Sequence, residues 1–281
     1  MHNKKLHDEG NLSGDVLDFF RLVRNPLQEM TDVKNFYIPH SFVFYERKIF
    51  ESASRDIPFI FIEGPLGVGK TTFLKYLISQ IENSNEYSYL PDLNLALNRY
   101  VKSGRVIHRQ FKKEVIKTIN RSPSISQKKL ILIIDDLHLL KSKVLESVFD
   151  IGRHGTSSRV VSIVGSTDSD YIYKLFKHSY EFCTRDLSVC MTLNPLNRTE
   201  TERYLYKRFF EAGLTFLNEI ICRDAIDIIH QVTHGVPRAV NIFTEMLLFK
   251  AFEANQQAIT SGFIYDLIGT SNLQDAVAAY E

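Results

Sequence analysis

Residues 64–71 read Gly-Pro-Leu-Gly-Val-Gly-Lys-Thr and match the spacing G-x-x-x-x-G-K-[ST], which restricts the fold of this chain more than any other feature. The glycines allow a tight turn in which successive backbone N–H groups point inward at an anion. Lys70 then reaches the β- and γ-phosphates of a nucleotide, and the Thr71 hydroxyl completes the coordination of Mg²⁺. The pattern therefore predicts a phosphate-binding loop that takes ATP with Mg²⁺.

The residues on either side of this loop support the prediction. Residues 58–62 form a short apolar run typical of a buried strand, and residues 72–81 carry apolar side chains at helical spacing. The N-terminus of such a helix attracts phosphate. An accidental glycine-rich turn is the alternative, but the strand before the loop and the helix after it argue against that. The predicted nucleotide contacts are Gly64, Pro65, Leu66, Gly67, Val68, Gly69, Lys70, Thr71 and Thr72.

A second apolar strand ends in two acids. Residues 130–134 are all aliphatic and are followed by Asp135 and Asp136. A strand that is apolar on both faces belongs in the middle of a parallel sheet, and acids at its carboxyl end lie beside the phosphate loop. We therefore expect Asp135 to hold Mg²⁺ through water and Asp136 to polarise the attacking water. Two acids that merely cap a solvated helix are the alternative.

The order of the expected elements indicates an α/β fold with a helical lid. Strands and helices alternate up to Asn194, which favours a parallel sheet covered by helices on both faces, and only helical patterns follow. We expect an N-terminal segment at 1–57, a P-loop domain at 58–196 and a helical lid at 197–281. The expected strands are 58–62, 130–134, 159–164 and 187–193. The expected helices are 41–54, 71–82, 105–119, 141–152, 170–178, 199–212, 218–233, 237–253 and 262–269.

Composition restricts the compartment and the partners. The formal net charge of +1 gives no global argument for a polyanionic partner. The three cysteines form no C-x-x-C pattern, as is typical of core thiols in a reducing compartment. The N-terminus lacks the apolar core of a signal peptide, and the longest apolar run is too short to span a bilayer. We expect a soluble, cytoplasmic protein with no integral membrane segment.

One expected helix is strongly basic. Residues 99–121 hold eight basic residues and one acid, and Arg105, Arg109, Lys113 and Lys117 recur every four residues. An amphipathic helix with a solvated outer face is the simplest interpretation. A surface for DNA or for an acidic partner is the alternative.

Several further motifs resemble those of AAA+ ATPases of the ExeA/GspA type. Residues 234–241, His-Gly-Val-Pro-Arg-Ala-Val-Asn, resemble the sensor 2 pattern G-x-P-R-x-[IV]-N of that family. Residues 193–213 are similar to the start of its lid, and residues 133–140 to its I-D-E-A-x-x-L strand. Residues 18–26 and 36–40 look like its N-terminal segment. The resemblance covers roughly residues 17–265.

This resemblance implies an ATPase that forms an ATP-dependent homo-oligomer with shared active sites. Arg238 would contact the γ-phosphate from the lid, although a cation at a helix start is the alternative. Arg185 matches the family arginine that precedes the last strand and acts on the neighbouring protomer, although an ordinary surface arginine is the alternative. Residues 162–168 resemble a sensor 1 segment, in which Thr167 is the candidate catalytic residue.

One departure from the family pattern bears on turnover. Asp136 stands where most members of the family carry a glutamate, and it is shorter by one methylene. Initiator-type ATPases resembling bacterial DnaA use two aspartates here, so we expect slow hydrolysis. The expected function is ATP-driven assembly or remodelling of a protein partner, in a secretion or pilus system by resemblance. A DNA-binding transposition regulator of the TnsC/TniB kind and a nucleotide-dependent switch with little turnover are the alternatives.

Overall fold

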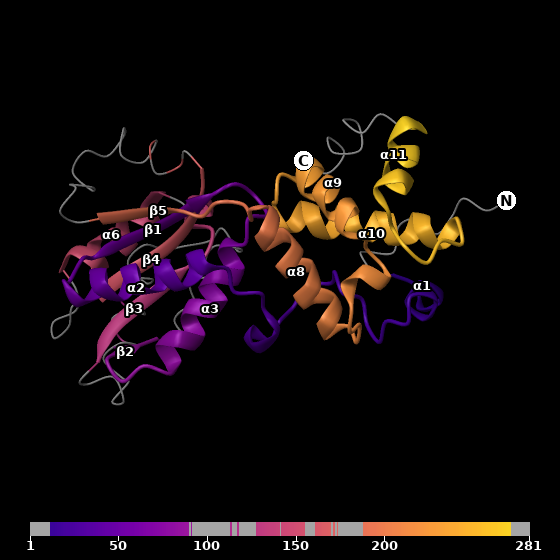
Figure 1. Cartoon of the computed structure of the whole chain (residues 1–281). Helices are drawn as coiled ribbons and strands as arrows, with labels where there is room; N and C mark the ends of the chain where they lie inside the picture. The colour runs from indigo at the N-terminus through magenta and orange to yellow at the C-terminus, as the bar shows by residue number, and fades with distance from the viewer. Residues whose placement is uncertain are drawn as a thin grey trace. The chain divides into compact units, whose positions relative to one another are not determined.

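The chain divides into two compact units. A computed structural model of the protein describes residues 12–89, 91, 113, 117, 128–140, 142–154, 161–169, 171, 173 and 188–270 (Figure 1). Residues 40–194 form the α/β unit, and residues 1–39 together with 195–281 form the helical unit.

The α/β unit is built on a parallel sheet whose described strands are arranged in the order β2-β3-β4-β1-β5 (Figure 1). β4 pairs with both β3 and β1, and β5 pairs with the other edge of β1. All of these pairs are parallel, which confirms the predicted sheet. The strands are β1 (Phe59–Gly64), β2 (Tyr87–Ser88), β3 (Lys129–Ile134), β4 (Val161–Asp168) and β5 (Ser188–Thr192).

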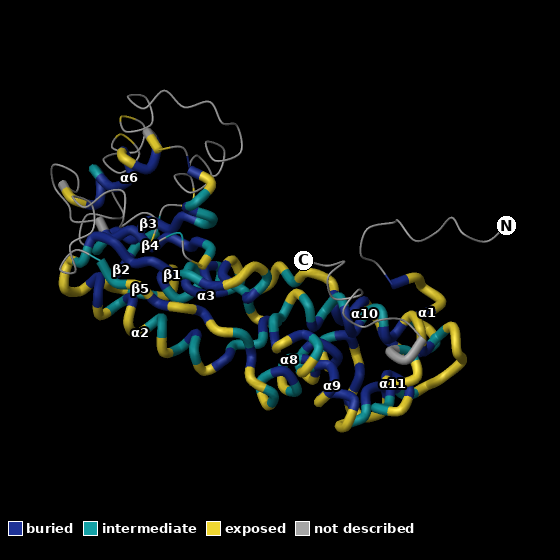
Figure 2. The backbone as a smooth tube through the Cα atoms, turned by 90° about the horizontal axis from the view of Figure 1, so that it is seen from above, coloured by how far each residue is buried: buried dark blue, intermediate teal, exposed yellow. Residues whose placement is uncertain are grey.

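Helices cover both faces of this sheet because the strands are apolar on both faces. Successive residues of β1 point to opposite faces, and Phe59 to Ile62 are all buried. On one face Phe149 of α6 (Ser142–His154) packs edge-on against Phe59 at 5.0 Å between ring centroids. α2 (His40–Ser54) and α3 (Lys70–Glu82) pack together through aromatic side chains. Figure 2 shows α6 and α2 on opposite sides of the buried strands.

Two strands depart most from the prediction. β4 runs on to Asp168, past the predicted end at 164, because its backbone continues to pair with β1 as far as Gly64. β2 was not predicted, since two residues in a polar segment show no periodicity. The predicted helix 105–119 lies outside the described residues except Lys113 and Lys117, which are helical and exposed. The predicted helix 170–178 also lies outside them, except Tyr171 and Tyr173.

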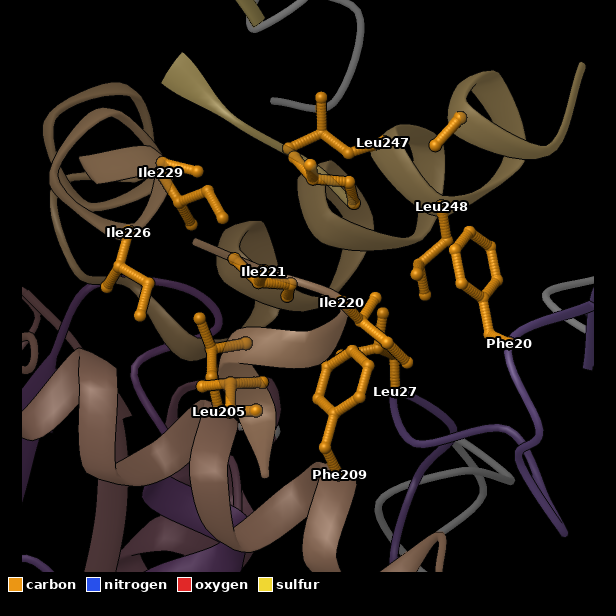
Figure 3. Packing of buried hydrophobic residues seen from close by; sticks show 14 of the residues in the cluster. Phe20, Leu27, Leu205, Phe209, Ile220, Ile221, Ile226, Ile229, Leu247 and Leu248 are labelled. Carbon is orange, nitrogen blue, oxygen red and sulfur yellow. The ribbon is translucent and has the colours of Figure 1, made fainter. Parts of the chain in front are cut away.

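The helical unit packs its helices around a separate apolar core. Helical spacing of isoleucine, leucine and phenylalanine gives each helix one apolar face, and these faces meet as Figure 3 shows. The elements are α1 (Gly14–Phe19), η1 (Val33–Asn35), α8 (Arg198–Glu211), η4 (Leu217–Glu219), α9 (Arg223–Thr233), α10 (Pro237–Glu253) and α11 (Ser261–Thr270). The labelled core residues are Phe20, Leu27, Leu205, Phe209, Ile220, Ile221, Ile226, Ile229, Leu247 and Leu248.

The N-terminal segment is part of the helical unit up to residue 39. Phe20 and Leu27 are buried in its core, next to residues of α8 and α10. Arg208 of α8 is also buried, and its guanidinium donates to the carbonyls of Pro26, at 2.6 Å, and of Gln28. Residues 40–57, including α2, instead belong to the α/β unit. The expected segment 1–57 is therefore divided between the two units.

The buried Arg208 gives a prediction about stability. Arg208→Met keeps an apolar stem but leaves the carbonyls of Pro26 and Gln28 without their donors. An unsatisfied buried polar group costs about 1–3 kcal/mol, so we expect the free energy of unfolding to fall by about 2 kcal/mol. Urea denaturation followed by circular dichroism measures this change. The control is Arg203→Met, which removes an exposed arginine from the same helix. Equal midpoints for the two variants would contradict the structural role of Arg208.

Candidate functional site

The predicted phosphate loop connects β1 to α3. β1 ends at Gly64, two residues beyond the predicted strand, and α3 begins at Lys70, one residue before the predicted helix. Gly67 and Gly69 have φ angles of 77° and 105°, which only glycine adopts without strain. Gly64 has no room for a side chain, because an added Cβ would lie 2.8 Å from the carbonyl oxygen of Leu193. The glycines of the motif are therefore required by backbone geometry.

Lys70 is buried beneath the loop, and its charge is fully hydrogen bonded. Its side chain is 7% exposed, and Nζ donates to the carbonyl oxygens of Gly64 at 2.7 Å and of Pro65 at 3.2 Å. A third bond, of 3.0 Å, joins Nζ to Oδ1 of Asp168 at the end of β4. A buried ammonium needs such partners because desolvation of an unpaired charge is costly. The three acceptors fix the position of Nζ.

Thr71 and Asp135, the two predicted metal ligands, are hydrogen bonded to each other. Thr71 Oγ1 donates to Asp135 Oδ2 at 2.7 Å, so the first turn of α3 meets the end of β3. The other carboxylate oxygen accepts a bond from the Ser166 hydroxyl, which in turn accepts one from Asp136 N at 2.9 Å. Hydroxyl and carboxylate oxygens are the hard ligands that Mg²⁺ prefers.

Few protein ligands are needed at such a site. The described residues contain no cluster of three or more His, Cys, Asp or Glu side chains suited to a metal. Mg²⁺ is commonly held by one or two protein groups, with waters and substrate phosphates completing its octahedron. The pair Thr71 and Asp135 therefore fits Mg²⁺ bound together with a nucleotide.

Asp136 lies beside this pair in a strained conformation. Its φ and ψ of 50° and 51° fall in the left-handed region, and it precedes a single turn of 3-10 helix, η3 (Leu137–Leu139). Burial raises the pKa of the Asp136 carboxyl, and the neighbouring Asp135 carboxylate raises it further, whereas His138 and Lys70 lower it. A non-glycine residue in this region often marks a functional position.

In the segment that resembles sensor 1, the residues that contact the site differ from the one predicted from the sequence. Side chains alternate along β4, so Ser166 and Asp168 share one face and Thr167 points to the other. Ser166 contacts Asp135, and Asp168 contacts Lys70. Thr167 is fully buried, and its hydroxyl has no hydrogen-bond partner among the described residues.

His138 is another residue that sequence reasoning did not select. Its Nε2 lies 3.2 Å from Asp168 Oδ2, so Asp168 joins it to Lys70. The extent of β4 is the feature that could have identified its partner Asp168. Because side chains alternate along a strand, a β4 that reaches residue 168 places Asp168 beside the loop.

The structure does not test the roles predicted for the two arginines. Arg185 lies outside the described residues. Arg238 is exposed in the first turn of α10, within the helical unit. The preceding Gly235 has a φ of 70°, and an added Cβ would lie 1.9 Å from the carbonyl oxygen of Leu196. The contact of Arg238 with nucleotide stays a prediction.

Comparison with known proteins identifies the fold that carries this site. Residues 91–208 match the KAP family P-loop domain. The structure is similar to the Aeropyrum pernix ORC1 protein in complex with DNA, with a TM-score of 0.59 at 15% identity, over 82% of this chain and 65% of that one. The fold is that of a P-loop NTPase domain of the AAA+ type. No curated protein sequence matches the chain significantly.

Two other AAA+ structures agree with this assignment. The Aeropyrum pernix ORC2 protein matches with a TM-score of 0.58 at 13% identity, over 88% of this chain and 71% of that one. Thermotoga maritima RuvB matches with a TM-score of 0.52 at 17% identity, over 84% of this chain and 70% of that one. The chain thus spans about two thirds of the length of each relative, and slightly less for ORC1. At these identities the likeness shows the AAA+ fold alone.

Within the ranges that the structure describes, no helix is long and apolar enough to cross a membrane.

The conformation of Gly69 allows the cost of backbone strain to be measured without any steric clash of an added side chain. An added Cβ at Gly69 would meet nothing within 4 Å, so Gly69→Ala tests the φ of 105° alone. Strain of this kind costs about 1–3 kcal/mol, and we expect the free energy of unfolding to fall by that amount. Gly14→Ala is the matched control, because its Cβ also meets nothing but its backbone is helical. Chemical denaturation measures both, and a stable Gly69→Ala variant would contradict the strained loop.

Proposed function

We propose that this AAA+ domain binds ATP with Mg²⁺ in the loop of residues 64–72 and hydrolyses it slowly. The observation that carries the proposal is the 2.7 Å bond between Thr71 and Asp135, beside a glycine loop that holds Lys70. The resemblance to P-loop ATPases supports the same assignment. The Aeropyrum pernix ORC2 protein, which shares the fold, was solved in complexes with ADPNP and ADP.

Each residue of the site has a distinct role in this proposal. The backbone N–H groups of the loop and Lys70 hold the β- and γ-phosphates, while Thr71 and Asp135 hold Mg²⁺. The metal supplies positive charge that offsets the charge of the phosphates. Asp136 accepts a hydrogen bond from the attacking water and polarises it. Because aspartate is shorter than glutamate by one methylene, this water is held less well and turnover is slow.

We further propose that nucleotide state drives assembly or remodelling of a protein partner by a homo-oligomer. This part rests on the resemblance to ATPases of the ExeA/GspA type. By that resemblance, Arg185 would act on the nucleotide of a neighbouring protomer, and Arg238 would act from the lid. An arginine finger is worth about 10³–10⁵ in rate. A secretion or pilus system is the setting that the resemblance favours, and the cytoplasm is the compartment.

A DNA-binding regulator of the TnsC/TniB kind is the second candidate. Lys113 and Lys117 are helical and exposed, one turn apart, as a basic face requires. The Aeropyrum pernix ORC1 and Drosophila ORC structures, which share the fold, were solved with DNA. If this face follows a phosphate backbone, each charge removed lowers the slope of log affinity against log salt by about one. A DNA titration at several salt concentrations distinguishes the two candidates.

Nucleotide binding is tested by Lys70→Ala, which removes the one buried ammonium of the loop. We expect ATP affinity to fall at least about 100-fold, or about 2.7 kcal/mol, because charge-assisted bonds to phosphate are lost. Isothermal titration calorimetry with Mg²⁺ measures this. Lys48→Ala is the control, since Lys48 is an exposed lysine on α2 of the same unit. Equal affinities for the two variants would show that the loop is not the nucleotide site.

Hydrolysis is tested by Asp136→Asn. An amide cannot polarise water as a carboxylate does, so we expect ATP binding to persist and turnover to fall about 10²- to 10⁴-fold. Phosphate release measures turnover, and calorimetry confirms that the variant still binds ATP. A variant with wild-type turnover would refute the role of Asp136. Binding without measurable turnover in the wild-type protein would instead favour the nucleotide-dependent switch.

A further inference from the structure

Lys70 has no hydrogen-bond donor left for a phosphate in the arrangement described. An ammonium carries three N–H groups, and those of Lys70 face the carbonyls of Gly64 and Pro65 and the carboxylate of Asp168. The two carbonyls belong to the loop backbone and are fixed by it. Asp168 is the one partner that can turn away by side-chain rotation. A phosphate that bonds to Lys70 must therefore replace Asp168.

Asp168 also repels a phosphate by its charge. It is the last residue of β4 and lies in register with Gly64, the first residue of the loop. Its side chain is 47% exposed, so it can move toward solvent, whereas that of Lys70 is 7% exposed. A carboxylate that stays beside Lys70 would face the negative phosphates at close range. The same side chain thus neutralises Lys70 and opposes nucleotide binding.

His138 offers the second binding partner for this carboxylate. Its Nε2 lies 3.2 Å from Asp168 Oδ2, the oxygen that Lys70 does not use. The imidazole is 19% exposed and packs edge-on against Tyr171, at 6.0 Å between ring centroids. Its Nδ1 is buried and has no partner within the described part of the chain. Nε2 is therefore the nitrogen that is available to Asp168, and the ring is held in place to receive it.

We propose that Asp168 competes with the nucleotide phosphates for Lys70, and that His138 retains the Asp168 carboxylate once a phosphate has displaced it. The inference rests on the proposed nucleotide binding and deepens it. Asp168 and His138 are positioning residues in this account, because they act on the nucleotide through Lys70. Lys70 then has an anionic partner in both states, which is Asp168 in the nucleotide-free protein and a phosphate in the nucleotide-bound protein.

The variant Asp168→Asn tests the competition, because the amide keeps the shape and removes the charge. We expect ATP to bind about tenfold more tightly, a gain of about 1.4 kcal/mol. We also expect the melting temperature of the nucleotide-free protein to fall, because Lys70 loses its counter-charge. A residue with a structural role alone would lower both affinity and melting temperature. A rise in ATP affinity together with a fall in melting temperature therefore identifies competition.

Asp56→Asn is the matched control. Asp56 also pairs with a lysine, at 2.6 Å from Lys129 Nζ, but it precedes β1 and so lies at the opposite edge of the sheet from the loop. The chemical change is the same and the unit is the same. We expect ATP affinity to equal that of the wild-type protein, as measured by calorimetry under identical conditions.

The role of His138 is tested by a double-mutant cycle. We expect His138→Ala to weaken ATP binding several-fold, because the displaced carboxylate has lost its partner, whereas His138→Gln keeps an N–H donor and binds as the wild type does. Combining His138→Ala with Asp168→Asn should restore the tight binding of Asp168→Asn, since no carboxylate remains to be held. If His138→Ala does not fold, His138→Leu takes its place in the cycle.

These measurements separate failure of nucleotide binding from failure of the Asp168 competition and from failure of the His138 role. If the wild-type protein and Lys70→Ala both fail to bind ATP, the proposed function is wrong, and this inference falls with it. If the wild type binds ATP but Asp168→Asn binds no more tightly than Asp56→Asn, the competition is wrong and the proposed function stands. If the effect of His138→Ala on ATP affinity simply adds to that of Asp168→Asn in the double variant, His138 does not hold the displaced carboxylate.

Discussion

The parallel pairing of β4 with β1 on one side and β3 on the other brings Asp135, Ser166 and Asp168 beside the phosphate loop. In register, β4 reaches Asp168 opposite Gly64 and runs alongside β3 up to Ile134, just before Asp135. The carboxyl ends of the three strands therefore lie at one edge of the sheet, where the loop turns into α3. Without β4 in this place, Lys70 would lose its bond to Asp168, and Asp135 would lose its bond to Ser166.

The site also shows how a buried ammonium and the carboxylates around it keep their charges paired. Lys70 is buried, but each of its donors has an acceptor, and the Asp135 carboxylate accepts bonds from Thr71 and from Ser166. A partly satisfied polar network in a low dielectric would be costly. Because each of these bonds joins two different elements, the loop, β3 and β4 are fixed relative to one another. Binding of a nucleotide exchanges partners within this network.

The sequence was sufficient to predict the parts of this site that depend on local chemistry. The glycines, Lys70 and Thr71 follow from the backbone geometry of a phosphate loop, and the aliphatic run before Asp135 predicts a central strand. Ser166, Asp168 and His138 could not be chosen in this way, because their roles depend on the length and register of β4. A shift of one residue would have reversed the faces of Ser166 and Thr167. The burial of Phe20 and Leu27 in the helical unit likewise depends on contacts between segments about 180 residues apart in sequence.

The central claim is that Thr71 and Asp135 together hold Mg²⁺ against a bound nucleotide. It is tested most directly by ATP affinity with and without Mg²⁺ for the wild type, Thr71→Val, Asp135→Asn and the double variant. The account predicts that Mg²⁺ strengthens ATP binding by the wild-type protein, that each single substitution removes most of this gain, and that the double variant loses little more. Single variants that keep the full effect of Mg²⁺ would contradict it.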